Sequence, residues 1–552
     1  MYNWYNILRR VATFDSLSSK EKKFLQAQEL LAEIAKTMPD SSPLKNKSYI
    51  AGGAVRDEIM GVVPDDIDIV VESPNGGIEM AEYISKLLNL SPPVTYPKFG
   101  TAALYLKNAN FGDRDYDVDG IKVEFVQSRA EHYQEDSRKP DAVSYASLKD
   151  DVKRRDLTIN SLLKNLSSGP SYGSTVEERK QSANQKINDG SILDLTGHGL
   201  SDIENGIIRT PDNPDIIYKD DPLRILRAIR FSVKYGWQMT DDLIEGIKRN
   251  IFRLQSKAIS AERIRDEMNK IMKYKKLHQA IPMMDALTDG NTSILDIVFP
   301  ELAQLKEVEQ DAVWHSEGSA YVHTLRVIES VEKDNDEVDE AVILSAMAHD
   351  LGKRDTKEKD EATGRIHFLG HEKVSVKLIE ERMRELKYPN EIINKVKFLI
   401  GNHMRAQHAK DWSPKAYRKF YQEMGDDYED VLKLMKADEQ ASLTEEYAKK
   451  GLQWSNPDNY QTIRENMPKA LAIPIRNKPI LNGVDMQTLF NIKPGLIIGE
   501  LMKAQNEIML SKPELSDRNQ YSEEQIKENM KKEMFSDPSV SEILNKYSKP
   551  NV

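Results

Sequence analysis

The chain has 552 residues, which predicts several domains, and it contains no cysteine, which excludes disulfides, cysteine nucleophiles and thiolate metal sites. Its formal net charge of −11 argues against a highly basic coat for nonspecific nucleic-acid binding, because affinity for phosphate backbones comes largely from Lys and Arg. No apolar run approaches the ~20 residues that cross a bilayer, and residues 1–10 lack the apolar segment of a secretory signal, so we expect a cytoplasmic protein without a membrane partner.

Residues 1–45 are predicted to form a helical N-terminal extension. Ala27, Leu31 and Ile34 recur at helical spacing, and the pattern ends near Pro39. No residue in this stretch indicates a chemical role.

Strand patterns dominate from residue 48 to about residue 165. We expect strands at 67–71, 102–106 and 121–126, with an opening strand before Gly52. This stretch predicts an α+β head built on a small mixed sheet.

An acidic segment connects the last two of these strands. Four aspartates alternate from Asp113 and look like the start of a calcium loop, but with Asp115 as first ligand Val126 stands where the loop needs a bidentate Glu. We therefore predict an acidic hairpin connection. The later stretch 166–186, rich in Ser, Gly, Asn and Gln, predicts a mobile insertion.

Two glycines follow the opening strand and precede a predicted helix over 55–60. Gly52 and Gly53 allow a tight turn with close backbone approach, and the start of the helix offers free N–H groups to phosphate. Arg56 adds a forked cation for the same oxygens. The turn is predicted to cradle a triphosphate.

Two acids come shortly after this turn. Asp66 and Asp68 are two residues apart on a β-rich run, so we expect their carboxylates on one face of a strand, where they can ligate Mg²⁺. Divalent cations held there would activate an attacking hydroxyl and steady a leaving pyrophosphate, which is nucleotidyl-transfer chemistry. Glu124 is a candidate third catalytic carboxylate, although an ordinary exposed strand Glu fits the local pattern equally well.

A second polar group follows the predicted sheet. Arg154, Arg155 and Asp156 open a predicted helix, which places Asp156 and Asn160 one turn apart on the same face. Arginines can neutralise phosphate, and the Asp and Asn can hold ribose hydroxyls. Close to a nucleotide loop, these residues indicate ribose and phosphate recognition.

A basic helix is predicted to begin with Asp221 as its N-cap and Pro222 as its first residue. Arg224, Arg227 and Arg230 then share one side of that helix. Asp221 can accept from an exocyclic amine and Arg224 can donate to a ring nitrogen, an edge that matches cytosine and adenine but not uracil or guanine. The pair would select C and A without a template.

These motifs resemble, in order and spacing, those of the class II tRNA nucleotidyltransferases, the CCA-adding enzymes. The resemblance is carried by 52–57 with Asp66 and Asp68, by 154–160, 194–202, 221–230 and 262–264. It implies that Gly53, Arg56 and Arg154 bind the incoming CTP or ATP. It also implies Mg²⁺ on the two acids, base selection by Asp221 and Arg224, and nucleotide contacts from Arg227 and Arg230. One departure is Asp220-Asp221 where the family usually has Glu-Asp, which still keeps the base-selecting Asp.

Histidines are concentrated in the second half of the chain. Seven of the ten fall between His315 and His408. On predicted helices the order His, His-Asp, His, His, Asp is made by His323, His349, Asp350, His371, His403 and Asp438. Neutral imidazoles with carboxylates predict a site for one or two transition metals that could activate water against a phosphoester.

This half resembles an HD phosphohydrolase domain, of the kind found as a tail on some CCA-adding enzymes. The resemblance implies that His349 and Asp350 are metal ligands, joined by His323 and Asp438, with His371 and His403 as candidates for a second metal. It leaves three histidines as polar neighbours, namely His315, His367 and His408. It also implies 2′,3′-cyclic phosphodiesterase, 2′-nucleotidase and phosphatase activities that would repair tRNA ends.

We therefore expect an α+β nucleotidyltransferase head followed by an all-α neck, body and HD domain. The predicted boundaries are 1–45 for the N-terminal extension, 46–215 for the head, 216–310 for the neck and body, 311–450 for the HD domain and 451–552 for a helical C-terminal region. The expected reaction adds CCA to the 3′ end of tRNA from CTP and ATP, and partial addition of CC or A stays open. The alternatives are a poly(A) polymerase of the same superfamily, and an RNA-binding protein whose only chemistry lies in the HD domain.

Overall fold

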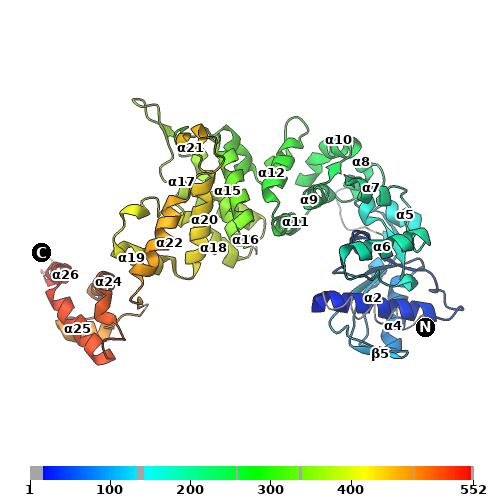
Figure 1. Cartoon of the computed structure of the whole chain (residues 1–552), viewed down its shortest axis with the longest axis horizontal. Helices are drawn as coiled ribbons and strands as arrows, with labels where there is room; N and C mark the ends of the chain where they lie inside the picture. Colours follow the sequence, from blue (N-terminus) through cyan, green and yellow to red (C-terminus); the bar gives the residue numbers. More distant parts are fainter. Residues whose placement is uncertain (1–16, 133–141, 257–258, 335–338, 477, 549–552) are drawn as a thin grey trace. The chain divides into compact units, whose positions relative to one another are not determined.

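The computed structural model describes residues 17–132, 142–256, 259–334, 339–476 and 478–548 (Figure 1). The chain divides into two units, the first ending at Pro300 and the second beginning at Glu301. The first unit contains a seven-stranded mixed sheet and helices, and the second is mostly helical, so the predicted fold class is confirmed. Among the described residues, no helix has both the length and the apolar character to span a bilayer.

The sheet of the first unit has the strand order β11-β10-β1-β2-β7-β4-β3. Its strands are β1 (Ser48–Ala51), β2 (Asp68–Val71), β3 (Val94–Tyr96), β4 (Thr101–Tyr105), β7 (Lys122–Gln127), β10 (Leu163–Asn165) and β11 (Ile192–Leu193). β2 and β7 pair in parallel, and the other neighbours are antiparallel. The three strands expected at 67–71, 102–106 and 121–126 are present as β2, β4 and β7. β5 (Ala109–Phe111) and β6 (Arg114–Tyr116) form the predicted hairpin between the last two.

Alternation along the strands sends apolar side chains to both faces of the sheet. Ile50 and Ile69 join a large core with helices α2 (Ser19–Thr37) and α4 (Gly76–Leu87), both visible beside the strands in Figure 1. Ala51 and Val70, one residue further along, join a smaller core with α5 (Leu148–Lys153). The sheet is therefore fixed in register, because a slip of one residue would exchange the two sets.

The stretch 166–186 is not the predicted mobile insertion. Helix α6 (Val176–Asn188) fills most of it and begins with a capping box between Thr175 and Glu178. Its Lys186 pairs at 3.1 Å with Glu58 of α3 (Gly53–Ile59), and the fully buried Lys164 pairs with the same carboxylate. The Lys186 pair ties α6 to α3, which packs against it, and the Lys164 pair ties β10 to the same helix.

Helices continue the first unit after the sheet. They are α7 (Gly199–Asn205), α8 (Pro214–Asp220), α9 (Arg224–Tyr235), α10 (Asp241–Asn250), α11 (Ala261–Lys273), α12 (Leu277–Ala286) and α13 (Ile294–Val298). α9 packs on α11 and α12, and Arg230 on α9 pairs with Glu267 of α11 at 2.6 Å. The arginines of α9 also line the cavity described below.

The second unit begins with a helical bundle. Its members are α15 (Ala320–Asp334), α16 (Glu340–Ala348), α17 (His371–Glu385), α18 (Asn390–Asn402) and α20 (Tyr428–Ala441). α15 packs on α16 and α20, and α18 packs on α16 and α17 (Figure 1). α19 (Pro414–Met424) lies between α18 and α20 along the chain, and α21 (Glu445–Lys449) and α22 (Asp458–Ala470) follow α20. The C-terminal helices α23 (Gly483–Phe490), α24 (Leu496–Ser511), α25 (Glu523–Ser536) and α26 (Pro538–Ser548) share a core of their own.

Candidate functional site

The glycine turn lies between β1 and α3, as the sequence predicts. Gly52 has φ +73°, a conformation that side-chain-bearing residues rarely adopt, and a Cβ there would lie 3.4 Å from Arg155 Nη1. Arg56 is buried on α3, and its guanidinium stacks on the rings of Phe231 and Tyr235 at 5.0 and 5.5 Å. The arginine is thereby held over the turn by α9, a contact that the sequence alone did not indicate.

The two acids lie at the start of β2, beside this turn. Asp68 is the first strand residue and half-buried, whereas Asp66 is exposed and precedes the strand, so the expectation of two residues on one strand is wrong for Asp66. Glu124 on β7 is the register partner of Asp68 and pairs with Lys122. Burial, and then the charges of Asp66 and Glu124, raise the pKa of Asp68 from 3.8 to about 6. A bound cation would relieve the repulsion that raises the pKa of the Asp68 carboxyl.

The polar group at 154–160 does not form the predicted helix. α5 ends at Lys153, a 3₁₀ turn covers Thr158–Asn160, and the chain then enters β10. The prediction of a helix relied on the helical spacing of the apolar residues, but in the structure these residues are buried beneath a turn and not along one face of a helix. Asp156 and Asn160 nevertheless contact each other, with Asn160 Nδ2 donating to Asp156 Oδ1 at 3.2 Å.

A chain of hydrogen bonds links this turn to α3 and α9. Arg56 donates to Asn160, Asn160 donates to Asp156, and Arg227 Nε donates to Asp156 Oδ2 at 2.7 Å. Burial alone would raise the pKa of Asp156, but the Arg227 guanidinium outweighs it and lowers the pKa to about 2. Asp156 therefore stays charged. Arg154 lies at the edge of the group, with its guanidinium 2.7 Å from Asp151.

The basic helix α9 begins at Arg224, later than predicted, because Asp221 ends α8 and a turn through Pro222 intervenes. Asp221 still caps this turn, since its Oδ1 accepts from the Leu223 N–H at 3.2 Å. Arg263 of α11 donates hydrogen bonds to both carboxylate oxygens of Asp221, at 3.1 and 2.6 Å. Arg263 lies in a motif that the sequence matched, but only the fold reveals its partner.

One cavity joins all of these groups. It has a volume of about 990 Å³ and lies within the first unit. Every predicted nucleotide-site residue except Glu124 lines it, namely Gly52, Gly53, Arg56, Asp66, Asp68, Arg154, Asp156, Asn160, Asp221, Arg224, Arg227 and Arg230. A cavity with acids at one wall and arginines along another can take a polyanion together with cations.

The second unit brings together all six predicted metal-site residues. They come from the bundle helices: His323 from α15, His349 and Asp350 from the end of α16, His371 from α17, His403 from the end of α18 and Asp438 from α20. The Nε2 atoms of His323 and His349 are 3.4 Å apart, and those of His371 and His403 are 3.3 Å apart. His367 and His408 are exposed.

Asp350 lies between the two histidine pairs. Its Oδ2 is 3.2 Å from His349 Nε2, and its Oδ1 is 3.2 Å from His371 Nε2. Lys353 Nζ lies 2.7 Å from Oδ2 but out of hydrogen-bond alignment, so this buried oxygen has no hydrogen-bond partner among the described residues. Burial lowers the pKa of His403 to about 4, which keeps that imidazole neutral. A buried carboxylate oxygen that lies close to imidazole nitrogens and has no hydrogen-bond partner among the described residues belongs to a donor set that fits a divalent cation.

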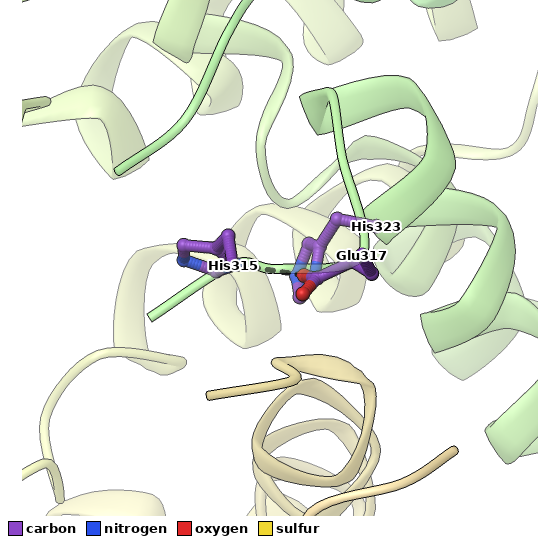
Figure 2. A group of neighbouring side chains, drawn as sticks. All are labelled: His315, Glu317 and His323. Carbon is purple, nitrogen blue, oxygen red and sulfur yellow. Dashed lines mark hydrogen bonds and ion pairs between the residues drawn. The ribbon is translucent and has the colours of Figure 1, made fainter. Parts of the chain in front are cut away.

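A further carboxylate in this region was missed by the sequence reasoning. Glu317 accepts from His315 Nδ1 at 2.8 Å and from His323 Nδ1 at 2.9 Å, as Figure 2 shows. Burial would raise its pKa, but these two hydrogen bonds lower it to about 2. His315, expected to be only a polar neighbour, is therefore hydrogen-bonded to the same carboxylate as a predicted ligand.

Models of known protein families match parts of both units. The model of the "Poly A polymerase head domain" matches residues 48–209, "Probable RNA and SrmB- binding site of polymerase A" matches 236–306, and "HD domain" matches 320–441. A tRNA nucleotidyltransferase of Schizosaccharomyces pombe is 29% identical over 280 residues, which covers 50% of this chain and 51% of that protein. The CC-adding tRNA nucleotidyltransferase of Thermus thermophilus is 25% identical over 466 residues, covering 83% of this chain and 88% of that protein.

Among solved structures, the Bacillus stearothermophilus CCA-adding enzyme in complex with CTP matches with a TM-score of 0.56 and 18% identity, covering 93% of this chain and 99% of that one. At this identity the likeness concerns the fold, and it extends over both units. The head match covers the glycine turn and the acid pair, and the HD match covers the histidine ligands. Together these matches support a class II tRNA nucleotidyltransferase of the CCA-adding kind, whose second unit carries an HD domain.

Proposed function

We propose that this protein adds C, C and A, one nucleotide at a time and without a template, to the 3′ end of tRNA from CTP and ATP. The observation that carries the proposal is the single cavity in which the Asp66 and Asp68 carboxylates meet the Asp221 and Arg224 edge. An acid pair alone would fit many phosphoryl-transfer enzymes. The addition of a base-reading edge in the same cavity favours a nucleoside triphosphate as the ligand.

Asp66 and Asp68 are proposed to hold Mg²⁺, with Glu124 beside them on β7. When bound, this cation would activate the 3′-hydroxyl and stabilise the leaving pyrophosphate. The protein's own residues position the substrates. Gly52, Gly53, Arg56 and Arg154 are proposed to bind the triphosphate. Asp156 and Asn160 are proposed to hold the ribose, because they are fixed by Arg227 and Arg56 and line the cavity.

Base choice is proposed to rest on Asp221 and Arg224. The carboxylate would accept from the exocyclic amine of C or A, and the guanidinium would donate to the adjacent ring nitrogen. Uracil and guanine would leave these polar groups unpaired, which is costly in a partly dehydrated site. Arg263 supports this role because it donates to both oxygens of the Asp221 carboxylate and fixes its orientation.

A second activity is proposed for the HD unit, namely hydrolysis of phosphoesters at damaged tRNA ends, including 2′,3′-cyclic phosphates, 2′-nucleotides and phosphomonoesters. The convergence of four histidines on Asp350 and Asp438 supports it. A divalent transition metal is the proposed cofactor, and when bound it would activate water. His349 and Asp350 are proposed as its central ligands.

The test is extension of tRNA that lacks its 3′ end. With CTP and ATP together we expect growth that stops after CCA, and Asp66→Ala should abolish it while phosphoester hydrolysis remains. A long A tract would instead establish the poly(A) polymerase alternative, and growth limited to CC or to A would narrow the proposal to partial addition. Hydrolysis that survives His349→Ala would remove the HD unit from the reaction.

A further inference from the structure

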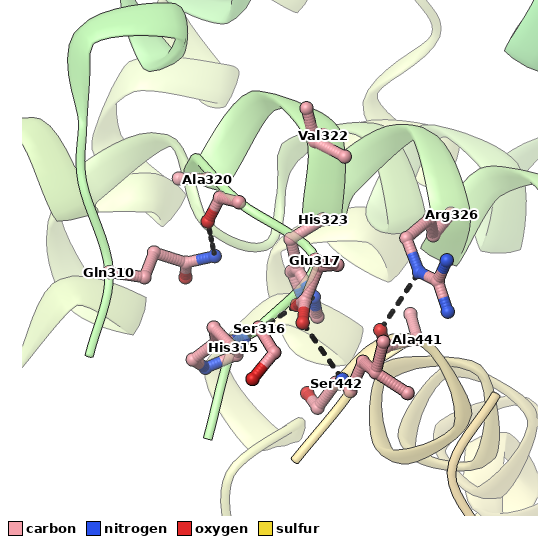
Figure 3. A network of polar contacts seen from close by, with 12 residues as sticks. Gln310, His315, Ser316, Glu317, Ala320, Val322, His323, Arg326, Ala441 and Ser442 are labelled. Atoms are coloured by element: carbon pink, nitrogen blue, oxygen red, sulfur yellow. Dashed lines mark hydrogen bonds and ion pairs between the residues drawn. The ribbon is translucent and has the colours of Figure 1, made fainter. Parts of the chain in front are cut away.

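The two oxygens of Glu317 bind different partners. Oε1 accepts from the Nδ1 atoms of His315 and His323, at 2.8 and 2.9 Å, and Oε2 accepts from the backbone N–H of Leu443 at 2.8 Å. The Glu317 side chain is only 1% exposed. Figure 3 shows the carboxylate between α15 and the segment that follows α20.

The first contact determines how His323 presents its ring. An ionised carboxylate has no proton to donate, so His323 Nδ1 carries the proton and Nε2 is the nitrogen that would face a cation. Nε2 points into the histidine cluster, 3.0 Å from Asp438 Oδ1 and 3.7 Å from Asp350 Oδ2. Carboxylates placed behind metal-binding histidines in this way orient the ring and raise its basicity.

The second contact joins Glu317, which precedes α15, to the segment that follows α20, and these two helices bear His323 and Asp438. Leu443 follows the end of α20, the helix of Asp438, and the Ser316 N–H donates back to the Leu443 carbonyl at 2.7 Å. Arg326 of α15 independently donates to the Ala441 carbonyl at 3.0 Å (Figure 3). Loss of Glu317 would therefore leave α15 attached to α20 while freeing the His323 ring.

We infer that Glu317 is a positioning residue of the HD unit, which fixes the His323 imidazole with Nε2 toward a divalent cation and joins that ligand to the segment bearing Asp438. The inference rests on the proposed metal centre of this unit. Glutamine could not replace Glu317 in this role. Three N–H groups point at the side chain, whereas an amide offers only one acceptor oxygen, and its NH₂ group would face one of these N–H groups.

The test uses the full chain, stripped of metal, as Glu317→Gln and Glu317→Ala, with Glu309→Gln as the matched control because Glu309 is 81% exposed. Co²⁺ is titrated and followed by the visible absorbance that imidazole ligation gives, which excludes binding at the carboxylates of the first unit. We expect Co²⁺ affinity ten- to a hundredfold weaker in both Glu317 variants, and unchanged in the control. Affinities within twofold of wild type would overturn the inference.

A second measurement does not depend on metal binding. In ¹⁵N–¹H spectra of histidine rings of the metal-free protein, the His323 Nδ1 proton should exchange slowly in wild type and control, and rapidly in Glu317→Ala. If the wild type binds no Co²⁺, the proposed metal centre is wrong. The exchange rate of the His323 Nδ1 proton would still show whether Glu317 holds the His323 ring. If Zn²⁺ removes the Nδ1 protons of His315 and His323 together, Glu317 is a direct metal ligand and the positioning role is wrong.

Discussion

Replacing Asp68 with Asn should inactivate nucleotide addition and, in the absence of divalent cations, stabilise the first unit. The pKa of Asp68 rises from 3.8 to about 6 through burial and the charges of Asp66 and Glu124. Each tenfold change in proton affinity corresponds to about 1.4 kcal/mol, so the charged side chain opposes folding by about 3 kcal/mol before screening. Asp68 is only half-buried, and solvent screening reduces the expected gain to about 1–2 kcal/mol.

The sign of the pH dependence follows from the direction of this shift. A carboxyl whose folded-state pKa lies above its unfolded value costs stability as the pH rises between the two values. The advantage of Asp68→Asn should therefore be absent near pH 4, grow up to about pH 6 and remain constant above it. Mg²⁺ should reverse the order, because it binds and stabilises only the wild type.

Calorimetry in EDTA at several pH values measures this effect, and hydrogen exchange of the β2 amides localises it. For a unit of this size the gain corresponds to a rise of a few degrees in Tm. Asp113→Asn, at an exposed turn of the β5–β6 hairpin, is the control for removing one negative charge. The reasoning would be refuted if Asp68→Asn were less stable than wild type at pH 8 in EDTA. It would also be refuted if the gain in stability were the same at pH 4 as at pH 8.

Three further predictions concern other parts of the chain. Arg263→Ala should reduce discrimination between CTP and UTP, measured as the ratio of kcat/KM values, by about tenfold or more, because Asp221 loses the guanidinium that fixes both its oxygens; an unchanged ratio would detach Arg263 from base choice. Glu58→Gln should destabilise the first unit by about 3–5 kcal/mol in urea unfolding, because Lys164 is left buried without its charge partner, and a change below about 1 kcal/mol would contradict this. After dialysis against a chelator, Mg²⁺ alone should restore nucleotide addition but not phosphoester hydrolysis, so the protein should then have the same activities as His349→Ala. Full recovery of hydrolysis with Mg²⁺ would exclude a transition-metal centre.

The elements predicted best from the sequence are those that local rules specify. The Gly52 turn needs a residue that tolerates positive φ, and the strands around it alternate apolar residues because both faces of the sheet are covered. The six HD-site residues could also be named from their order, because each lies at or near a helix end where spacing along the chain is easy to read. Their convergence, in contrast, is a property of the bundle.

The predictions that failed lacked such a local determinant. The apolar residues at 157–162 have helical spacing, yet Thr158 bonds to Asp202 and to the Arg209 carbonyl, partners far along the chain that hold a turn instead. For α6 the capping box at Thr175 and Glu178 was readable, but the Ser- and Gly-rich context outweighed it in the prediction. Glu317 was assigned no role from the sequence; its histidine partners are close along the chain, but Leu443, which its other oxygen binds, is 126 residues away.

The two units differ in the chemistry of the ligands they offer, and this difference gives the protein a way to keep two reactions separate. In the first unit the candidate ligands are carboxylates with arginines along the same cavity, a set that suits a hard cation shared with phosphate oxygens. In the second unit four imidazoles lie close to the buried carboxylate of Asp350, one oxygen of which has no hydrogen-bond partner among the described residues, a set that suits a borderline transition metal held by the protein itself. A cation in the first unit would be shared with the nucleotide, whereas a metal in the second unit would be held by protein ligands such as His323, which Glu317 is proposed to position. Metal exchange should therefore switch the hydrolytic unit without altering the base-reading edge in the head.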